Sequence, residues 1–342
     1  MPATIKDVAR MAGVSIKTVS RVMNDEPHVT KETRDRVMTA VRAVGYAPNI
    51  SARRLVQNKS FMICLLMYPG YYQTASGLLN VIMDIGYEEN YDILIQPYFP
   101  THTRSRKKLV SLIYEHRIDG FVTTPPCDAE DFVSDLLNTY KVPLVQINPF
   151  HQTSAIPWVA GNDVEGARSM TEHLIGLGHR EIAFLYGPRN MRASQDRMNG
   201  FFTALHAHSL TARADWIQDS AFTFDGGYTA AKLMIQTPSG PPTAIFAGND
   251  EAAYGAIFAA QELGLNVPVD ISIAGFDDLN MSKNIWPGLT TVHQPDEEIV
   301  DQAIRLLIRL LKGQALPSSQ IQIPSRLIIR HSTAPPNHHQ PV

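Results

Sequence analysis

Two patterns of hydrophobic positions divide this chain. Residues 5–44 carry apolar side chains at helical spacing with almost no strand signal, and Pro48-Asn49 ends that pattern abruptly. From Phe61 onward, short apolar runs alternate with longer amphipathic stretches. We therefore expect an all-helical head over residues 1–47, a linker over 48–60 and a larger body over 61–330. Residues 331–342 are rich in Pro, His and Asn without periodicity, which predicts a disordered tail.

The body repeats the order strand, helix, strand. Its apolar runs predict strands at 61–67, 91–95, 118–123, 142–147, 181–186, 243–247 and 271–276. The stretches between them predict helices near 75–89, 104–116, 130–139, 163–177, 194–208, 226–236, 250–263 and 295–312. Such alternation produces doubly wound parallel sheets with helices on both faces. The fold class is therefore α/β, with a small all-α head.

The composition favours an ordinary soluble globular protein. Hydrophobic residues make up 44% of the 342 positions. No run approaches the roughly 18 uninterrupted apolar residues that span a membrane. The N-terminus has no apolar core followed by a small-residue cleavage site, so we predict no signal peptide. Cys64 and Cys127 lie in or beside apolar runs, which favours buried free thiols over a reactive or metal-binding role. We expect a cytoplasmic protein with no membrane partner.

The formal charge is distributed unevenly along the chain. Residues 1–60 hold eleven Lys or Arg and five Asp or Glu, a balance of +6, whereas the remaining residues carry −9. A basic head joined to an acidic body is typical of a protein in which one part binds a polyanion such as DNA.

Capping residues and a glycine define three helices in the head. Thr4 begins a helix over about 5–11, and Ser15 begins a second over 16–23, because each hydroxyl can accept a hydrogen bond from a free backbone N–H. Gly13 supplies the tight turn between them. A third helix over 30–44 completes the bundle. The expected small core consists of Ile5, Val8, Ala9, Val14, Val19, Val22, Val37, Val41 and Val44.

This arrangement is a helix-turn-helix, whose second helix enters the major groove of DNA. Lys17 and Arg21 can donate to guanine acceptors, and Ile16 can contact a thymine methyl group. Neighbouring polar side chains, with Lys31 and Arg34, suit phosphate contacts that set the register. The expected DNA-binding residues of the head are Thr4, Ser15, Ile16, Lys17, Thr18, Ser20, Arg21, Asn24 and Thr30.

The head closely resembles that of the lactose- and galactose-repressor family of bacterial transcription regulators. The resemblance lies in residues 4–24, TIKDVARMAGVSIKTVSRVMN, and continues in GYAPN at 45–49 and ARRL at 52–55. In that family, the residues after this Pro-Asn form a hinge helix that folds on the operator and enters the minor groove. The resemblance makes Leu55 the side chain that wedges a central base step, with Asn49, Ala52 and Arg53 beside the DNA.

The resemblance extends over about residues 61–330. The segments that carry this resemblance are residues 118–121, 173–180, 182–188, 248–250, 273–278 and 289–292. Family members have a periplasmic-binding-protein-like body of two lobes, with an effector held between them and a dimer formed by the body. This implies a first lobe of about 61–160 and 292–321, and a second of about 161–290 and 322–330.

Polar residues directly after predicted strands mark the expected effector site, because ligands of such folds bind beyond the carboxyl ends of the strands. Asn148, Asn249 and Asp277 have this position, although Asn249 could instead cap a turn. By match to the family, Arg197, Asn249, Asp277 and Gln294 are effector contacts.

The sequence departs from the family pattern at two places that bear on the ligand. Gly161 stands where some members have an aromatic residue, and Asn162-Asp163 reverses the family's usual Asp-Asn order. Aromatic candidates for apolar contact with a sugar are Tyr68, Tyr71, Tyr72 and Phe222.

The sequence gives little support for an enzymatic function. The glycines at 176–178 end a helix, which is the wrong context for a dinucleotide loop, and GxxxxGK[ST], GxSxG and HExxH are absent. His206, His208, His338 and His339 lack partners at ligand spacing, so we expect no metal, no cofactor and no catalytic residue. The basic run 104–108 opens a predicted helix and is best explained as a solvated face.

These observations predict a repressor that binds a pseudo-palindromic operator as a homodimer at the nucleoid, under the control of a small effector, most simply a sugar. The dimer follows because one head reads too few base pairs for genomic specificity. One alternative is a corepressor-dependent regulator that responds to a nucleobase or a partner protein. A second is a sugar-processing enzyme with a borrowed DNA-binding head.

Overall fold

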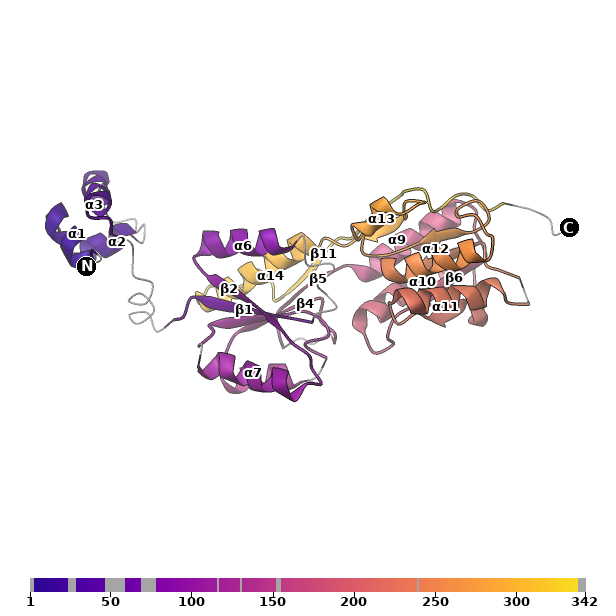
Figure 1. The fold of residues 1–342 in the computed structure, drawn as a ribbon, viewed down its shortest axis with the longest axis horizontal. Coiled ribbons are helices and arrows are strands. Elements are labelled where there is room, and N and C mark those ends of the chain that lie inside the picture. The colour runs from indigo at the N-terminus through magenta and orange to yellow at the C-terminus, as the bar shows by residue number, and fades with distance from the viewer. Residues whose placement is uncertain are drawn as a thin grey trace. The chain divides into compact units, whose positions relative to one another are not determined.

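The computed structural model describes residues 3–23, 29–46, 59–68, 78–115, 117–129, 131–151, 155–238 and 240–337. It contains two compact units, Met1–Ser60 and Phe61–Val342 (Figure 1). Several residues singled out in the sequence lie outside the described ranges. They are Asn24, Asn49, Ala52, Arg53, Leu55, Tyr71 and Tyr72.

The head consists of three helices, α1 (Ile5–Ala12), α2 (Ile16–Met23) and α3 (Lys31–Val44). Their bounds match the prediction to within a residue. Val8, Val19 and Val37 have no exposed surface and form the centre of the bundle. The predicted core residues Val41 and Val44 are only half-buried and pack at its edge. Hydrophobic packing of one face of each helix therefore holds this small unit together.

The turn between α1 and α2 depends on Gly13 and on a residue of α3. Gly13 has a φ of +66°, a left-handed conformation that costs other residues about 1 kcal/mol. The guanidinium of Arg36 donates to the carbonyl of Ala12 at 2.7 Å, which satisfies a free carbonyl at the end of α1. The third helix thus fixes the turn that orients α2.

Lobe 1 of the body is built on a six-stranded sheet of parallel strands in the order β11-β5-β4-β3-β1-β2. Helices α6 and α14 cover one face, with α7 on the other (Figure 1). Helix α8 packs on the same face as α7. The strands are β1 (Met62–Met67), β2 (Asp92–Pro97), β3 (Gly120–Thr123), β4 (Leu144–Ile147), β5 (Trp158–Gly161) and β11 (Gln320–Ile323). The helices are α6 (Leu78–Glu89), α7 (Thr103–Tyr114), α8 (Phe132–Thr139) and α14 (Asp296–Leu311).

Lobe 2 has a four-stranded parallel sheet in the order β7-β6-β8-β9. Helices α9 and α10 cover one face, and α11 and α12 cover the other. The strands are β6 (Ile182–Tyr186), β7 (Ile217–Asp219), β8 (Ala244–Ala247) and β9 (Ser272–Ala274). The helical elements are α9 (Asp163–Gly176), α10 (Arg192–Ala207), the 3-10 helix η2 (Ala214–Trp216), α11 (Phe224–Ile235), α12 (Asp250–Glu262) and α13 (Met281–Asn284).

The structure adds strands that the sequence pattern missed. β10 (Thr291–His293) and β12 (Arg326–Ile328) form an antiparallel pair, and β10 extends the path of β9 through a bridge from Ala274 to Thr290. The last strand before α14, β10, ends at 293, and β11 ends at 323, each within two residues of an expected crossing between the lobes. Strands β5, β7, β10, β11 and β12 were not predicted. β3, β4, β8 and β9 are equally short, but each lies in a longer apolar run, whereas β7, β10, β11 and β12 contain polar residues that interrupt such a run.

The expected disordered tail is wrong for residues 331–337, which pack on lobe 2. Ser332 is fully buried, and its Oγ accepts a bond from the backbone N–H of Thr290 at 2.8 Å and donates to the carbonyl of Ile273. His179, also buried, bonds to the carbonyl of Ala334 at 2.9 Å. Irregular backbone can be ordered when its polar groups find partners in this way.

Within the described ranges, no helix is both long enough and apolar enough to cross a membrane. Cys64 and Cys127 are buried free thiols, as predicted, and burial raises the pKa of Cys127 to about 12. The same part of the chain contains no group of three His, Cys, Asp or Glu that could hold a metal ion.

Candidate functional site

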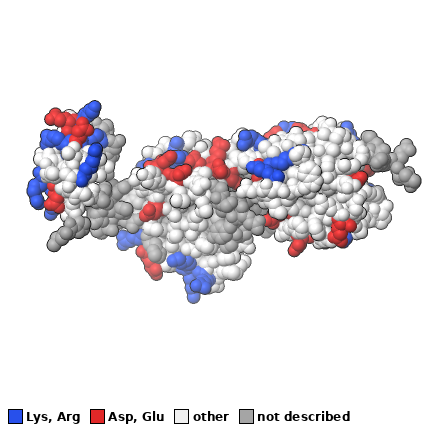
Figure 2. All heavy atoms as spheres, turned by 45° about the horizontal axis from the view of Figure 1, so that its top comes forward, with Lys and Arg blue, Asp and Glu red and all other residues white. Residues whose placement is uncertain are grey.

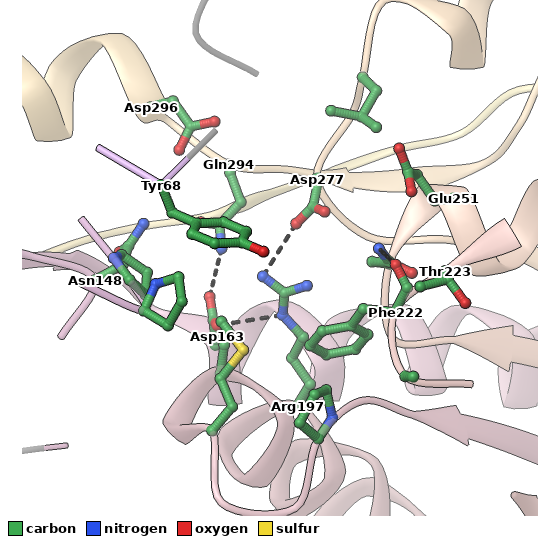
Figure 3. A pocket seen from close by; sticks show the side chains of 18 residues that line it. Tyr68, Asn148, Asp163, Arg197, Phe222, Thr223, Glu251, Asp277, Gln294 and Asp296 are labelled. Atoms are coloured by element: carbon green, nitrogen blue, oxygen red, sulfur yellow. Dashed lines mark hydrogen bonds and ion pairs between the residues drawn. The ribbon is translucent and has the colours of Figure 1, made fainter. Parts of the chain in front are cut away.

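A cavity of about 400 Å³ lies at the carboxyl ends of strands from both lobes (Figure 3). This is the place where open α/β sheets bind ligands. Asn148 follows β4, Asn249 follows β8 and Asp277 follows β9, whereas Arg197 comes from α10. The lining residues are Tyr68, Pro125, Pro126, Asn148, Asp163, Pro188, Met191, Ala193, Arg197, Ala221, Phe222, Thr223, Asn249, Glu251, Asp277, Leu279, Gln294 and Asp296.

Arg197 lies at the centre of the cavity wall and is 6% exposed. Its Nε lies 3.2 Å from Asp163 Oδ2, and its Nη2 lies 3.0 Å from Asp277 Oδ1. The remaining Nη1 donates to the carbonyl of Gly248 at 2.6 Å. The guanidinium also stacks over the ring of Phe276, 3.9 Å from its centroid. These contacts hold a rigid, planar hydrogen-bonding group beside the cavity.

Gln294 occupies the space next to Gly161. Its Nε2 donates to Asp163 Oδ1 at 2.6 Å, and its Oε1 accepts from Ser325 Oγ at 3.3 Å. A Cβ at position 161 would lie 2.1 Å from Gln294 Oε1. The glycine noted in the sequence as a departure from the family is therefore what gives the glutamine room. The preceding departure has a similar reason: Asn162 caps α9 by accepting from the N–H of Glu165, which leaves Asp163 to face Arg197.

The two asparagines are held by backbone contacts. Asn148 has a φ of +44° and accepts from the N–H of Gly161 at 3.1 Å. Asn249 caps α12 by accepting from the N–H of Ala252 at 3.0 Å, and its Nδ2 donates to the carbonyl of Phe222 at 2.9 Å. The alternative in which Asn249 is a cap is thus correct, although the residue also lines the cavity.

Two aromatic side chains contribute apolar surface. Phe222 adopts a φ of +57°, and the centroid of its ring lies 5.5 Å from the Arg197 guanidinium. A Cβ at Gly187 would lie 2.4 Å from that ring, so this glycine is needed for the approach. Tyr68, at the end of β1, enters the cavity from lobe 1 (Figure 3). One aromatic from each lobe therefore faces the enclosed space.

Carboxylates dominate the charge around the cavity. Burial is the main reason that the pKa of Asp277 rises to about 6, although Arg197 opposes the rise. Burial and then the nearby Asp277 raise the pKa of Asp296 to about 7. Burial also raises the pKa of Glu251. Acidic groups with raised pKa values at a cleft are typical of functional sites.

The structure brings together most of the effector residues expected from the sequence. Seven of the eight line the cavity, namely Tyr68, Asn148, Arg197, Phe222, Asn249, Asp277 and Gln294. The eighth, Tyr72, is outside the described ranges. Three acidic lining residues were missed: Asp163, Glu251 and Asp296. Each lies in the first turn of a helix, where an acidic residue is ordinary and gives no sequence signal of a ligand.

In the head, α2 presents polar and apolar faces as predicted. Val19 and Val22 are buried, whereas Ile16 is 45% exposed and Lys17 is also exposed. Lys and Arg side chains lie over much of the head surface seen in Figure 2. Ser20 and Arg21 are half-buried on the same helix. The first turn of α2 therefore carries an exposed apolar group and a cation side by side, and such groups can contact a thymine methyl and guanine acceptors.

Hydroxyl groups among the expected DNA-binding residues also begin the helices. Ser15 Oγ accepts from the N–H of Thr18 at 3.1 Å and Thr30 Oγ1 from that of Thr33 at 3.4 Å. Thr4 donates twice to the Asp7 carboxylate, whose Oδ2 accepts from both the N–H and the Oγ1 of Thr4. Thr4, Ser15 and Thr30 remain exposed, so capping leaves their second lone pairs accessible.

Comparison with protein families identifies both units. A model described as bacterial regulatory proteins of the lacI family matches residues 4–49, and a periplasmic binding protein-like domain matches residues 171–333. Catabolite control protein A of Priestia megaterium is 33% identical over 334 residues, which cover 97% of this chain and 100% of the relative. The HTH-type transcriptional repressor PurR of Proteus mirabilis (strain HI4320) is 32% identical, covering 97% of each chain.

Solved structures give the same result. The lac repressor dimer bound to operator and the anti-inducer ONPF superposes with a TM-score of 0.75 and 27% identity, over 98% of this chain and 100% of that one. The complex of the transcriptional regulator CelR with cellobiose gives a TM-score of 0.72 and 25% identity, over 96% and 99%. These relatives are DNA-binding regulators and not enzymes. A helix-turn-helix head and a ligand-binding sensor body thus occur together along the whole chain, which belongs to the LacI family of bacterial transcription regulators.

Proposed function

We propose that this protein represses transcription by binding a pseudo-palindromic operator as a homodimer, and that a polyhydroxylated effector in the body cavity controls its operator affinity. The DNA-binding part depends on one observation above all: Ile16 and Lys17 are exposed at the start of α2 while Val19 and Val22 are buried. This leaves the N-terminal turn of the helix available to base edges. DNA binding would locate the protein in the cytoplasm, at the nucleoid.

A sugar fits the cavity better than a nucleobase. Carboxylate, amide and guanidinium groups from Asp277, Asn148 and Arg197 can each bond a hydroxyl, which both donates and accepts. A nucleobase needs stacking between two aromatic faces. Phe222 already has Arg197 near one face. The remaining described aromatic, Tyr68, can cover one side of a sugar ring. The cellobiose complex of CelR, a structural neighbour, agrees with this choice.

Selection of duplexes from a randomised pool by the full-length protein tests the DNA-binding proposal. We expect enrichment of sites with two-fold symmetry. The Lys17→Ala variant should bind the selected site at least about fivefold more weakly, since one lost base contact costs roughly 1–3 kcal/mol. Lys107→Ala removes the same charge from the exposed basic run of α7 in the body and should bind as the wild type does. Equal weakening by both variants would mean that general charge, and not α2, directs binding.

A further inference from the structure

The ionisable groups around the cavity do not balance. Among the described residues that line it, four carry carboxylates, Asp163, Glu251, Asp277 and Asp296, and Arg197 alone carries a permanent positive charge. Volume, position at the strand ends and the aromatic wall already define the cavity as a binding site. The charge balance bears on a different question, the kind of ligand that this site accepts.

Two of the carboxylates are matched within the protein. Asp163 bonds to Arg197 through one oxygen and to Gln294 through the other. Asp277 pairs with a second nitrogen of the same guanidinium. Arg197 is thus shared between two carboxylates, and its third nitrogen, Nη1, donates to the carbonyl of Gly248. This guanidinium is bonded to protein groups of the cavity wall and therefore offers little net positive charge to a ligand.

The other two carboxylates have no such match. Within the described ranges, no Lys, Arg or His forms an ion pair with Asp296 or Glu251. Figure 3 shows them on either side of Asp277, Asp296 from the start of α14 and Glu251 from the start of α12. A partly buried carboxylate without a cation is costly, and a ligand that brings a positive charge removes that cost.

The surface next to the cavity has the same sign. A neighbouring hollow shares Asp277, Gln294 and Asp296 with the cavity and adds Glu297 and Glu298 from the same turn of α14. The hollow is lined by one guanidinium, that of Arg326, and by five carboxylates. Asp278 is the fifth, beside the four just named. Asp278 is occupied by Arg330 and by His293. A cationic ligand is attracted to this side of the cavity, and a phosphate is repelled.

We propose that the effector is a cationic polyol, an amino sugar or similar amino-polyhydroxy compound, whose protonated amine binds between Asp296 and Asp277 or beside Glu251. This proposal rests on the proposed function, because it names the ligand class for the same cavity. Hydroxyl groups of the ligand meet Asn148, Asn249 and the edge of Arg197, and its ring lies on Tyr68. Asp296 and Glu251 are then the residues that determine specificity.

Matched sets of sugars test the proposal on the full-length protein. Each set contains a neutral hexose, its 2-amino form, the N-acetylated amine and the 6-phosphate, for the gluco, galacto and manno series. Thermal shift and calorimetry at neutral pH measure binding of each up to tens of millimolar. We expect the amine of at least one set to bind about tenfold to a hundredfold more tightly than its neutral and acetylated partners. The phosphate should bind most weakly.

Two substitutions separate the ligand charge from general effects. Asp296→Asn should remove most of the amine preference while leaving binding of the neutral sugar within a few fold, and Glu251→Gln should do so if the amine lies at that side. Asp135→Asn changes the same group in the first turn of α8, an exposed site, and should retain the full preference.

Several outcomes would overturn the proposal. They are a neutral or phosphorylated sugar that binds more tightly than its amine, a preference unaffected by both Asp296→Asn and Glu251→Gln, or no response to any amine. Operator affinity measured in the same samples distinguishes this failure from failure of the proposed function. A neutral sugar that changes operator affinity would leave the function intact and reject the amine. An amine that binds without altering operator affinity would support the ligand class and reject the control of DNA binding.

Discussion

Gln294 reaches the cavity wall because Gly161 has no side chain: a Cβ there would lie 2.1 Å from Gln294 Oε1. The glutamine in turn donates to Asp163, which pairs with Arg197. A single glycine on β5 of lobe 1 therefore determines where a polar chain of three side chains lies. That chain joins the segment after β10 to helices α9 and α10 of lobe 2.

The first prediction concerns this glycine. Gly161→Ala should displace the Gln294 side chain, because 2.1 Å is far below any tolerated contact. We expect effector affinity, measured by calorimetry, to fall at least tenfold. Gly176→Ala is the control, because a Cβ at this helical position meets nothing within 4 Å. It should bind effector normally, and unchanged binding by Gly161→Ala as well would show that Gln294 is not part of the site.

The second prediction concerns the buried charge. Arg197→Met should lower the free energy of unfolding of the body by roughly 3–5 kcal/mol, because it leaves Asp163 and Asp277 without their cation. Arg168→Met is the matched control. Arg168 pairs with Glu165 and Glu172 on an exposed face of α9, where such pairs contribute about 0–1 kcal/mol. Urea unfolding of the two variants should differ accordingly, and equal losses would contradict the assigned role of burial.

Much of the fold could be predicted because the body is regular. The eight predicted body helices agree with α6 to α12 and α14 to within three residues, since long amphipathic periods are strong signals. Strands β5, β10 and β12 carry only three or four residues each. Their positions depend on partners that lie far away in the chain, such as Ile321 for Val159, and local patterns do not contain that information.

The cavity was predictable where residues follow strands, and less so elsewhere. Asn148, Asn249 and Asp277 stood out by position, because strand ends meet at one edge of a sheet, and the family match added Asn249 and Asp277 independently. Asp296 was missed because it opens α14, whose first turn also contains Glu297 and Glu298. Only the fold shows that Asp296, and not Glu297 or Glu298, lines this cavity. The tail was misjudged because the partners of Ser332 are backbone groups of Thr290 and Ile273, which leave no trace in composition.

The third prediction concerns pH. The pKa of Asp296 rises from 3.8 to about 7 in the folded protein, so the folded state binds the proton more tightly than the unfolded state. The contribution of this group to stability is therefore complete below about pH 4 and is lost as the pH rises toward 7. Asp296→Asn cannot titrate. Its melting temperature relative to the wild type should increase between pH 4 and 7, whereas a constant difference would contradict the raised pKa.

The fourth prediction concerns the C-terminal segment. A chain that ends at Arg330 loses Ser332 and Ala334, which leaves the N–H of Thr290 and the ring of His179 without these partners. Unsatisfied buried groups cost about 1–3 kcal/mol each, so the melting temperature should fall by several degrees. A chain that ends at Asn337 retains all these bonds and should melt as the full chain does. Equal melting of both truncated proteins would show that the segment adds no stability.

The fifth prediction concerns the hinge, which lies outside the described residues. If Leu55 wedges a base step as the family resemblance implies, Leu55→Ala should weaken operator binding, because the bent DNA then loses its apolar support. Effector affinity should be unchanged, since the substitution lies outside the body. Gel-shift and calorimetric measurements on the same preparation separate the two effects, and full operator affinity in the variant would remove the wedge from the mechanism.

The most direct measurement is the dissociation constant for the selected operator, determined by fluorescence anisotropy with and without saturating effector. It should be made on the wild type and on Gly161→Ala. We expect effector to change the wild-type constant by about 5- to 150-fold, the usual range of coupling between two sites. At the same effector concentration the variant should respond far less. An operator affinity that is the same with and without bound effector in the wild type would contradict the proposal that the cavity controls the head.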